Sequence, residues 1–178
     1  MILVVFILFA QLVAKSCESD IIFKRKVENT GDEDKSREGR INIIFPGTKW
    51  CGKGDIARGE EDLGLFKKTD ACCRTHDNCP DFMNGHQTVH NLTNPNFFTR
   101  LSCDCDMKFY NCLKDAGGPV SRDIGVLYFN LLNTQCYKED FPIKGCRKHS
   151  YFPRKKCLDY VLDGSKEKVY QFFDLPRY

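Results

Sequence analysis

Two side chains suited to acid–base chemistry lie among cysteines of regular spacing. His76 lies four residues after Cys72 and three before Cys79, and Asp106 directly follows Cys105. A carboxylate beside an imidazole fixes the tautomer of the ring and stabilises its protonated form, and a general base that deprotonates water needs both effects. A histidine hydrogen-bonded inside a disulfide-linked core accounts for the same spacing.

The neighbouring Asp77 is a candidate ligand for a hard cation. Ca²⁺ is bound by carboxylate oxygens together with backbone carbonyls. The glycines of Trp50–Gly54 (WCGKG) allow a loop to turn its carbonyl groups inward, although the same pattern occurs in ordinary turns. Zinc is a competing interpretation, because thiolates and imidazoles are its usual ligands. Oxidation of the thiols in a secreted protein argues against zinc at its candidate ligands, Cys72, Cys73, His76, Cys79, Cys103 and Cys105.

Two predicted helices position these residues. The first begins at a Thr69 cap and runs from Asp70 to about Asp81, and the second runs from about Ser102 to Asp115. Cysteines seven residues apart lie on one face of a helix, and each helix carries such a pair. Antiparallel helices would form the pairs Cys72–Cys112 and Cys79–Cys105, and a parallel arrangement fits the same spacing.

The remaining pattern adds short elements around this helix pair. Ile43–Gly54 is expected to be a short strand that breaks into a Pro/Gly loop, and a third helix is expected to begin near Ser121. The polar segment Asn84–Asn96 is expected to be a surface loop, and it holds the glycosylation sequon at Asn91. A C-terminal hairpin is expected between Leu158–Leu162 and Lys168–Phe173, with its turn at Asp163-Gly164.

The composition limits the class of protein. The chain has 178 residues, of which 42% are hydrophobic, enough for one folded domain with a core. Its 27 basic and 24 acidic residues give a net charge of +3, which is too balanced for a dedicated nucleic-acid-binding protein. The 11 cysteines indicate an oxidising compartment and a disulfide framework.

The N-terminal end carries an apolar run that is too short to span a bilayer. Met1–Ala14 is apolar apart from Gln11, whereas a membrane-spanning helix needs roughly 18 such residues. We therefore expect residues 1–16 to be a secretory signal peptide, with a buried helix as the alternative.

Residues 17–40 are expected to be a propeptide. The stretch Lys15–Arg40 holds seven basic and seven acidic residues, and such a composition buries too little apolar surface to order itself. Cleavage after Arg37 or at the end of this stretch would leave a mature domain over residues 41–178 with ten cysteines. Ten cysteines can form five pairs, whereas Cys17, if retained, would be an odd thiol.

Together these motifs resemble the secreted phospholipases A2 of group III, the bee-venom type. The strongest likeness is the run CCRTHDNC at Cys72–Cys79, and Trp50–Gly54 resembles the calcium loop of that family. The likeness covers Ile43–Tyr178, and its further segments are Thr69–Asp77, Arg100–Asp106, Tyr128–Leu131 and Lys168–Gln171. The chain departs from the family pattern at Lys53, at Asp55 and in the longer, more basic segment between Cys146 and Cys157.

The resemblance implies a mainly α, disulfide-rich phospholipase A2 fold with a small β content, in which a calcium loop and a C-terminal hairpin accompany two antiparallel helices. It implies that His76 is the base that activates water, that Asp106 orients it and that Tyr128 supports the pair. One Ca²⁺ per catalytic site would be held by the carboxylate of Asp77 and the carbonyls of Trp50, Gly52 and Gly54. The implied disulfides are Cys51–Cys73, Cys72–Cys112, Cys79–Cys105, Cys103–Cys136 and Cys146–Cys157.

The resemblance further implies a secreted, extracellular monomer that uses calcium to hydrolyse the sn-2 ester of glycerophospholipids at a membrane surface. A toxin-like module that binds a cell-surface receptor without hydrolysis is the alternative. The basic run Arg154–Lys156 is either a solvated loop or a partner-binding site. Residues near the calcium loop and first helix are candidates for contact with lipid, and core packing is the alternative for the apolar ones: Ile43, Ile44, Phe45, Phe66, Lys67 and Phe82.

Overall fold

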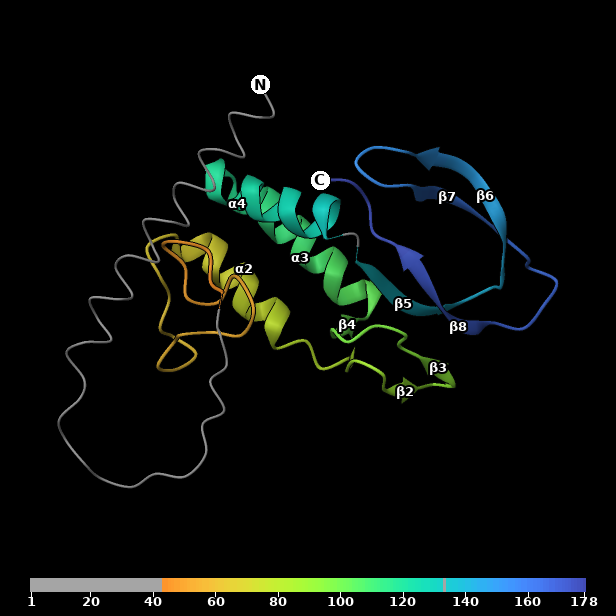
Figure 1. The fold of residues 1–178 in the computed structure, drawn as a ribbon, viewed down its shortest axis with the longest axis horizontal. Coiled ribbons are helices and arrows are strands. Elements are labelled where there is room, and N and C mark those ends of the chain that lie inside the picture. The colour runs from red at the N-terminus through yellow and green to blue at the C-terminus, as the bar shows by residue number, and fades with distance from the viewer. Residues whose placement is uncertain (1–42, 133) are drawn as a thin grey trace. The chain divides into compact units, whose positions relative to one another are not determined.

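The computed structural model describes residues 43–132 and 134–178. The expected signal peptide and propeptide, including Cys17, lie outside these residues. Helix α2 (Lys67–Asp77) lies beside α3 (Cys103–Ala116), and α4 (Gly118–Gly125) packs on α3 (Figure 1). In this part of the chain no helix is both long enough and apolar enough to cross a membrane.

Disulfides hold α2 and α3 together. Cys72 is bonded to Cys112, and Cys79, just after α2, is bonded to Cys105. The order of the partners is reversed along the second helix, so the two helices run in opposite directions. The other bonds join Cys51 to Cys73, Cys103 to Cys136 and Cys146 to Cys157, and these are the five pairings that the family resemblance implies.

The ends of α2 differ from the sequence prediction. The helix begins at Lys67, and no side chain caps it. The predicted Thr69 cap is therefore wrong, because its hydroxyl lies inside the helix and forms a 2.6 Å hydrogen bond with the hydroxyl of Ser121. The helix ends at Asp77 rather than near Asp81, since a proline at position 80 disfavours the helical conformation of the residue before it.

The following helices match the sequence prediction more closely. Ser102 caps α3 by accepting a hydrogen bond from the backbone N–H of Cys105. A proline occupies the first turn of α4. It is tolerated there because the N–H groups of the first turn form no hydrogen bond within the helix. The helical path then widens into a π-helix, η1 (Val126–Leu131), which carries Tyr128. Wide turns of this kind are frequent at functional sites.

The strands of the described residues form four two-stranded antiparallel sheets. The long ones are β5 (Gln135–Asp140) paired with β8 (Val169–Asp174), and β6 (Ile143–Ser150) paired with β7 (Lys156–Leu162). The short ones are β1 (Phe82–Met83) with β4 (Arg100–Leu101), and β2 (Thr88–Val89) with β3 (Leu92–Thr93).

The predicted C-terminal hairpin across Asp163-Gly164 is therefore wrong. Strand β7 pairs with β6, to which the Cys146–Cys157 disulfide also joins it, and β8 returns to pair with β5. The backbone N–H of Asp163 is bonded to the carbonyl of Pro142. The short strand predicted at the start of Ile43–Gly54 is reduced to an isolated antiparallel bridge between Ile44 and Gly52.

A continuous core lies between the helices and β8. It contains Phe109 and Leu113 of α3, Phe129 of η1 and Phe173 of β8, all buried. The half-cystines Cys72, Cys73, Cys103 and Cys136 are buried in the same cluster. A small domain gains stability from such cross-links, each contributing roughly 2–4 kcal/mol, and the facing surfaces of α2 and α3 are fixed as a result.

Candidate active site

The helix pair brings His76 and Asp106 into direct contact. The Nε2 atom of His76 lies 2.8 Å from Oδ1 of Asp106, and both residues are buried. The imidazole ring stacks on Phe109 with a centroid distance of 4.2 Å. The ring is therefore held by a hydrogen bond at one edge and by an aromatic face, which fixes its orientation.

Tyr128 completes a three-residue hydrogen-bonded array. Its hydroxyl donates to the same Oδ1 atom of Asp106 at 2.8 Å, and its ring meets His76 edge-on at 5.1 Å. Burial of Tyr128, together with the negative charge of Asp106, raises the pKa of its hydroxyl well above the ordinary value. The hydroxyl therefore keeps its proton at physiological pH and acts as a donor to Asp106.

This arrangement selects one tautomer of neutral His76. An ionised Asp106 can only accept hydrogen bonds, so Nε2 must carry the hydrogen that lies between them. The remaining nitrogen, Nδ1, then has a free lone pair. His76 retains 9% exposure, and no protein group among the described residues is hydrogen-bonded to Nδ1. The array can thus present a base to water.

The Gly-rich loop is tied to α2 beside this array. The Cys51–Cys73 disulfide joins loop to helix three residues before His76. A Cβ atom at Gly52 would lie 2.0 Å from the carbonyl oxygen of Ile43, so only glycine fits. Gly54 has a φ of +75°, which also favours glycine. Both glycines are therefore required by the path of the loop.

Asp70 organises the loop from inside the protein, a role that sequence analysis missed. Its fully buried carboxylate accepts hydrogen bonds from the backbone N–H groups of Lys49, Trp50 and Gly64 at 2.7–3.0 Å. A buried acid one turn before the Cys72–Cys73 pair is an available signal, because such a residue must find several donors.

The charge around Asp77 suits a cation. Desolvation by the surrounding protein, together with the negative charges of Asp55 and Asp70, raises the pKa of Asp77 to about 7. In the described part of the chain no lysine or arginine forms an ion pair with Asp77. The carboxylate of Asp77 offers hard oxygen atoms, which are the ligands that Ca²⁺ prefers.

Zinc does not fit the same region. The cysteines proposed as zinc ligands are all bonded in disulfides. Within residues 43–132 and 134–178 there is no group of three or more histidine, cysteine or acidic side chains that could hold a metal. A metal at this site would therefore depend on backbone carbonyls in addition to Asp77.

The candidate lipid-contacting residues fall into two groups. Ile43 is 70% exposed, and Phe66, Lys67 and Phe82 are also exposed. Ile44 and Phe45 are half-buried, and Phe45 packs against the core. Leu65, next to Phe66, is 81% exposed and was not among the predicted residues, although its position beside Phe66 was an available signal.

The sequon residue Asn91 is exposed at the turn between β2 and β3. It has a φ of +59°, a conformation that asparagine tolerates better than most residues. The predicted surface loop thus contains a small hairpin that presents Asn91 to solvent.

The fold and the site define a class of small proteins in which disulfides join two helices and a buried histidine–aspartate pair lies between them. A family model described as phospholipase A2 matches residues 44–140. Proteins named phospholipase A2 from Apis mellifera and Apis dorsata are 53% and 51% identical over 137 residues, which is 76% of this chain and 80% and 100% of those proteins. Phospholipase A2 hemilipin from Hemiscorpius lepturus is 44% identical over 110 residues, 58% of this chain and 47% of that protein. The chain belongs to the phospholipase A2 family.

Replacing Asp70 with Asn tests the role of its carboxylate in holding the loop. The amide nitrogen of Asn cannot accept a hydrogen bond, so at least one buried N–H loses its partner. We expect the free energy of unfolding to fall by about 2–3 kcal/mol. Denaturant unfolding measures this change. Asp123→Asn, at an exposed position on α4, should change stability by less than about 0.5 kcal/mol, and an equal effect of both substitutions would contradict the assignment.

Proposed function

We propose that this protein is a calcium-dependent phospholipase A2 that hydrolyses the sn-2 ester of glycerophospholipids to a lysophospholipid and a free fatty acid. The observation that carries the proposal is the hydrogen-bonded array of His76, Asp106 and Tyr128 beside Asp77. Family membership supports the same reaction class.

His76 is the proposed general base. The lone pair on Nδ1 takes a proton from a water molecule as the water oxygen forms a bond to the ester carbonyl carbon. The resulting imidazolium keeps its Nε2–H bonded to Asp106, whose negative charge stabilises it. The proton on Nδ1 then passes to the sn-2 alcohol oxygen when the bond between that oxygen and the carbonyl carbon breaks.

Asp106 and Tyr128 act through His76. Because Tyr128 donates to the carboxylate, it helps to fix Asp106 in position. The other oxygen, Oδ2, is buried without a hydrogen-bond partner in the described residues, so no cationic side chain neutralises the carboxylate there. An ionised carboxylate in a buried site stabilises an adjacent imidazolium strongly.

Asp77 and the carbonyls of Trp50, Gly52 and Gly54 are the proposed ligands of one Ca²⁺. The bound ion would supply positive charge that polarises the ester carbonyl and attracts the substrate phosphate. Asp70 and the Cys51–Cys73 disulfide support this proposal, because they fix the loop against α2.

The proposed enzyme works at a phospholipid membrane surface. Ile43, Phe66 and Phe82 present apolar surface, and Lys67 supplies a positive charge for anionic head groups. The adjacent Leu65 joins this proposed surface. The half-buried Phe45 has a mainly structural role in the proposal, because it contacts the core.

Extracellular action follows from the disulfides. The ten cysteines of the described residues form five bonds, and such bonds persist in oxidising compartments. We therefore propose a secreted monomer, matured by removal of residues 1–16 and 17–40, with Asn91 available for glycosylation. Nucleic acid is not among its proposed partners.

His76→Gln tests the base. Glutamine cannot take a proton from water, so we expect hydrolysis of phosphatidylcholine vesicles to fall by about 10²–10⁴-fold. Fatty-acid release measures the change, and the unfolding midpoint checks the fold. His90→Asn removes an exposed histidine at a backbone conformation that asparagine tolerates, and it should remain fully active. A folded His76→Gln variant with wild-type activity would overturn the mechanism and favour the receptor-binding alternative.

Removal of calcium tests the metal. We expect EDTA to abolish hydrolysis, added Ca²⁺ to restore it, and Asp77→Asn to abolish Ca²⁺ binding measured by calorimetry. The wild-type dissociation constant should be about 10⁻⁴–10⁻³ M, as for other extracellular sites. Asp115→Asn, at an exposed position on α3, should bind Ca²⁺ normally. Hydrolysis that persists in EDTA would contradict calcium dependence.

A further inference from the structure

A strongly basic pocket lies apart from the candidate active site. Its volume is about 470 Å³, and residues of β4, β5, β6, β7 and β8 line it together with residues of the loops before β4, β5 and β7. His76, Asp77, Asp106 and Tyr128 are not among its lining residues. The basic residues that line it are Arg100, His149, Arg154, Lys155 and Lys156, and Asp174 is the one acid among the described lining residues.

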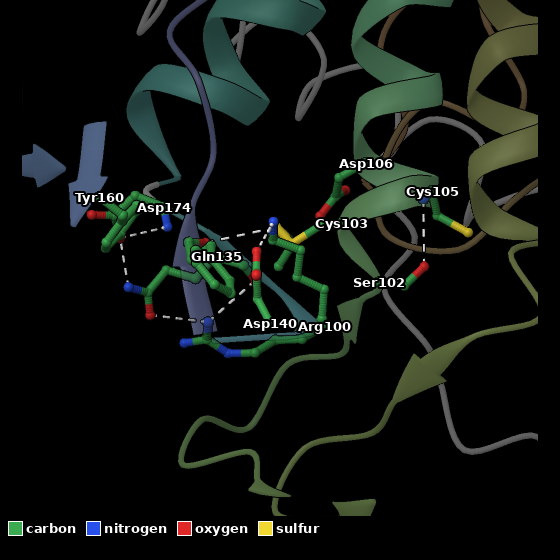
Figure 2. The surroundings of a disulfide bond; sticks show 12 residues. Arg100, Ser102, Cys103, Cys105, Asp106, Gln135, Asp140, Tyr160 and Asp174 are labelled. Atoms are coloured by element: carbon green, nitrogen blue, oxygen red, sulfur yellow. Dashed lines mark hydrogen bonds and ion pairs between the residues drawn. A yellow bond between two sulfur atoms is a disulfide. The ribbon is translucent and has the colours of Figure 1, made fainter. Parts of the chain in front are cut away.

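Arg100 brings a buried positive charge to this pocket without a carboxylate partner. Its Nε donates to Oδ1 of Asn94 at 3.1 Å and its Nη1 to Oε1 of Gln135 at 3.2 Å. The guanidinium also lies over the ring of Phe172, 4.5 Å from the centroid. Figure 2 shows Arg100 beside Gln135, which in turn contacts Asp174. Among the described residues, the hydrogen-bond partners of the guanidinium are therefore neutral groups.

Lys156 is a second buried basic residue that lines the same pocket. It is 1% exposed, and its Nζ donates to the carbonyls of Phe129 at 2.6 Å and Leu175 at 3.3 Å. Across the described residues no carboxylate lies within ion-pair distance of Lys156 or Arg100. Burial lowers the pKa of both side chains, and the negative charge of Asp174 opposes this shift.

Asp174 does not neutralise these cations directly. Its carboxylate accepts hydrogen bonds from the Gln135 side chain at 2.9 Å and from the backbone N–H of Cys157 at 2.8 Å. Arg154 and Lys155 add two exposed positive charges and form no ion pair in the part of the chain that the structure describes. Four lysine and arginine side chains thus line the pocket together with one acid, and basic groups are in excess there.

Part of the exposed rim of the pocket is apolar, and part is formed by Arg154 and Lys155. Phe98 and Leu132 line it and are exposed, and Phe97, which stacks edge-on with Phe98, is 85% exposed. An inorganic anion makes no favourable contact with apolar side chains at the rim. A phospholipid does, because its hydrocarbon lies next to its phosphate group. The volume also exceeds what a bare phosphate needs, since a single water molecule occupies about 30 Å³ of liquid.

We propose that this pocket binds the phosphate group of an anionic phospholipid as a second, non-catalytic lipid site. The phosphate lies between Arg100, Lys156 and the exposed side chains of Arg154 and Lys155, and the apolar rim residues contact the glycerol and upper acyl region. This interpretation assigns a partner to the basic run before Cys157. It does not depend on the proposed hydrolysis, because binding to this pocket needs neither His76 nor calcium.

The double variant Arg154→Gln/Lys155→Gln tests the proposal. Both residues are exposed, so the fold should be unchanged, and thermal unfolding checks this. The matched control is Lys144→Gln/Lys148→Gln, which removes the same charge from exposed positions of β6 that do not line the pocket. Binding is measured by sedimentation with ether-linked vesicles in EDTA, so that no lipid is cleaved. The vesicles contain phosphatidylcholine with or without phosphatidylglycerol.

We expect the pocket variant to bind phosphatidylglycerol vesicles at least about tenfold more weakly than wild type, and the control at most about threefold more weakly. Binding to pure phosphatidylcholine should change little. Equal losses in both variants would show general electrostatic attraction and overturn the proposal. Loss of binding to sulfated heparin fragments, with vesicle binding unchanged, would assign the pocket to a polysaccharide and overturn it as well.

Hydrolysis separates this proposal from the catalytic one. The pocket variant should cleave dispersed, monomeric short-chain phosphatidylcholine at the wild-type rate. A wild type without hydrolytic activity would contradict the proposed function and leave the vesicle-binding result intact. If the folded pocket variant instead hydrolyses monomeric phosphatidylcholine much more slowly than wild type, the pocket belongs to the catalytic site. That result would overturn the proposal of a separate site.

Discussion

The hydrogen bond between Nε2 of His76 and Oδ1 of Asp106 is the interaction on which the proposed chemistry depends. The two atoms are 2.8 Å apart and belong to different helices. A shift of either helix along the other by one residue, about 1.5 Å, would break the bond. The Cys72–Cys112 and Cys79–Cys105 disulfides prevent such a shift, because they join the same two segments on either side of His76.

The buried carboxylates explain why so small a domain sustains this arrangement. Asp106 and Asp70 are both fully buried, and a buried charge is costly unless donors surround it. Asp106 obtains its donors from His76 and Tyr128, and Asp70 obtains three from the backbone of the loop region. One buried carboxylate on each helix therefore fixes one part of the site: Asp106 of α3 holds the base, and Asp70 of α2 holds the proposed metal loop.

Sequence analysis predicted the parts of the molecule that local spacing determines. The seven-residue cysteine intervals left antiparallel and parallel helices open, and the resemblance favoured the antiparallel arrangement found in the structure. The strand pairing was missed, because β8 pairs with β5 across about 30 residues of chain, whereas Asp163-Gly164 offered a local turn signal. Asp70 and the place of Arg100 in the basic pocket were missed for a related reason, although the run Arg154–Lys156 was considered as a partner-binding site. Their roles arise from contacts between distant segments, and Arg100 and Lys156 show no partnership in the sequence.

The tautomer of His76 tests the central claim most directly. A ¹⁵N NMR spectrum of the folded protein, recorded at a pH where the ring is neutral, distinguishes a protonated from an unprotonated ring nitrogen. The hydrogen bond to Asp106 predicts that the hydrogen is on Nε2 and that Nδ1 is unprotonated. A ring that carries its hydrogen on Nδ1 would leave no lone pair for water and would contradict the proposed mechanism.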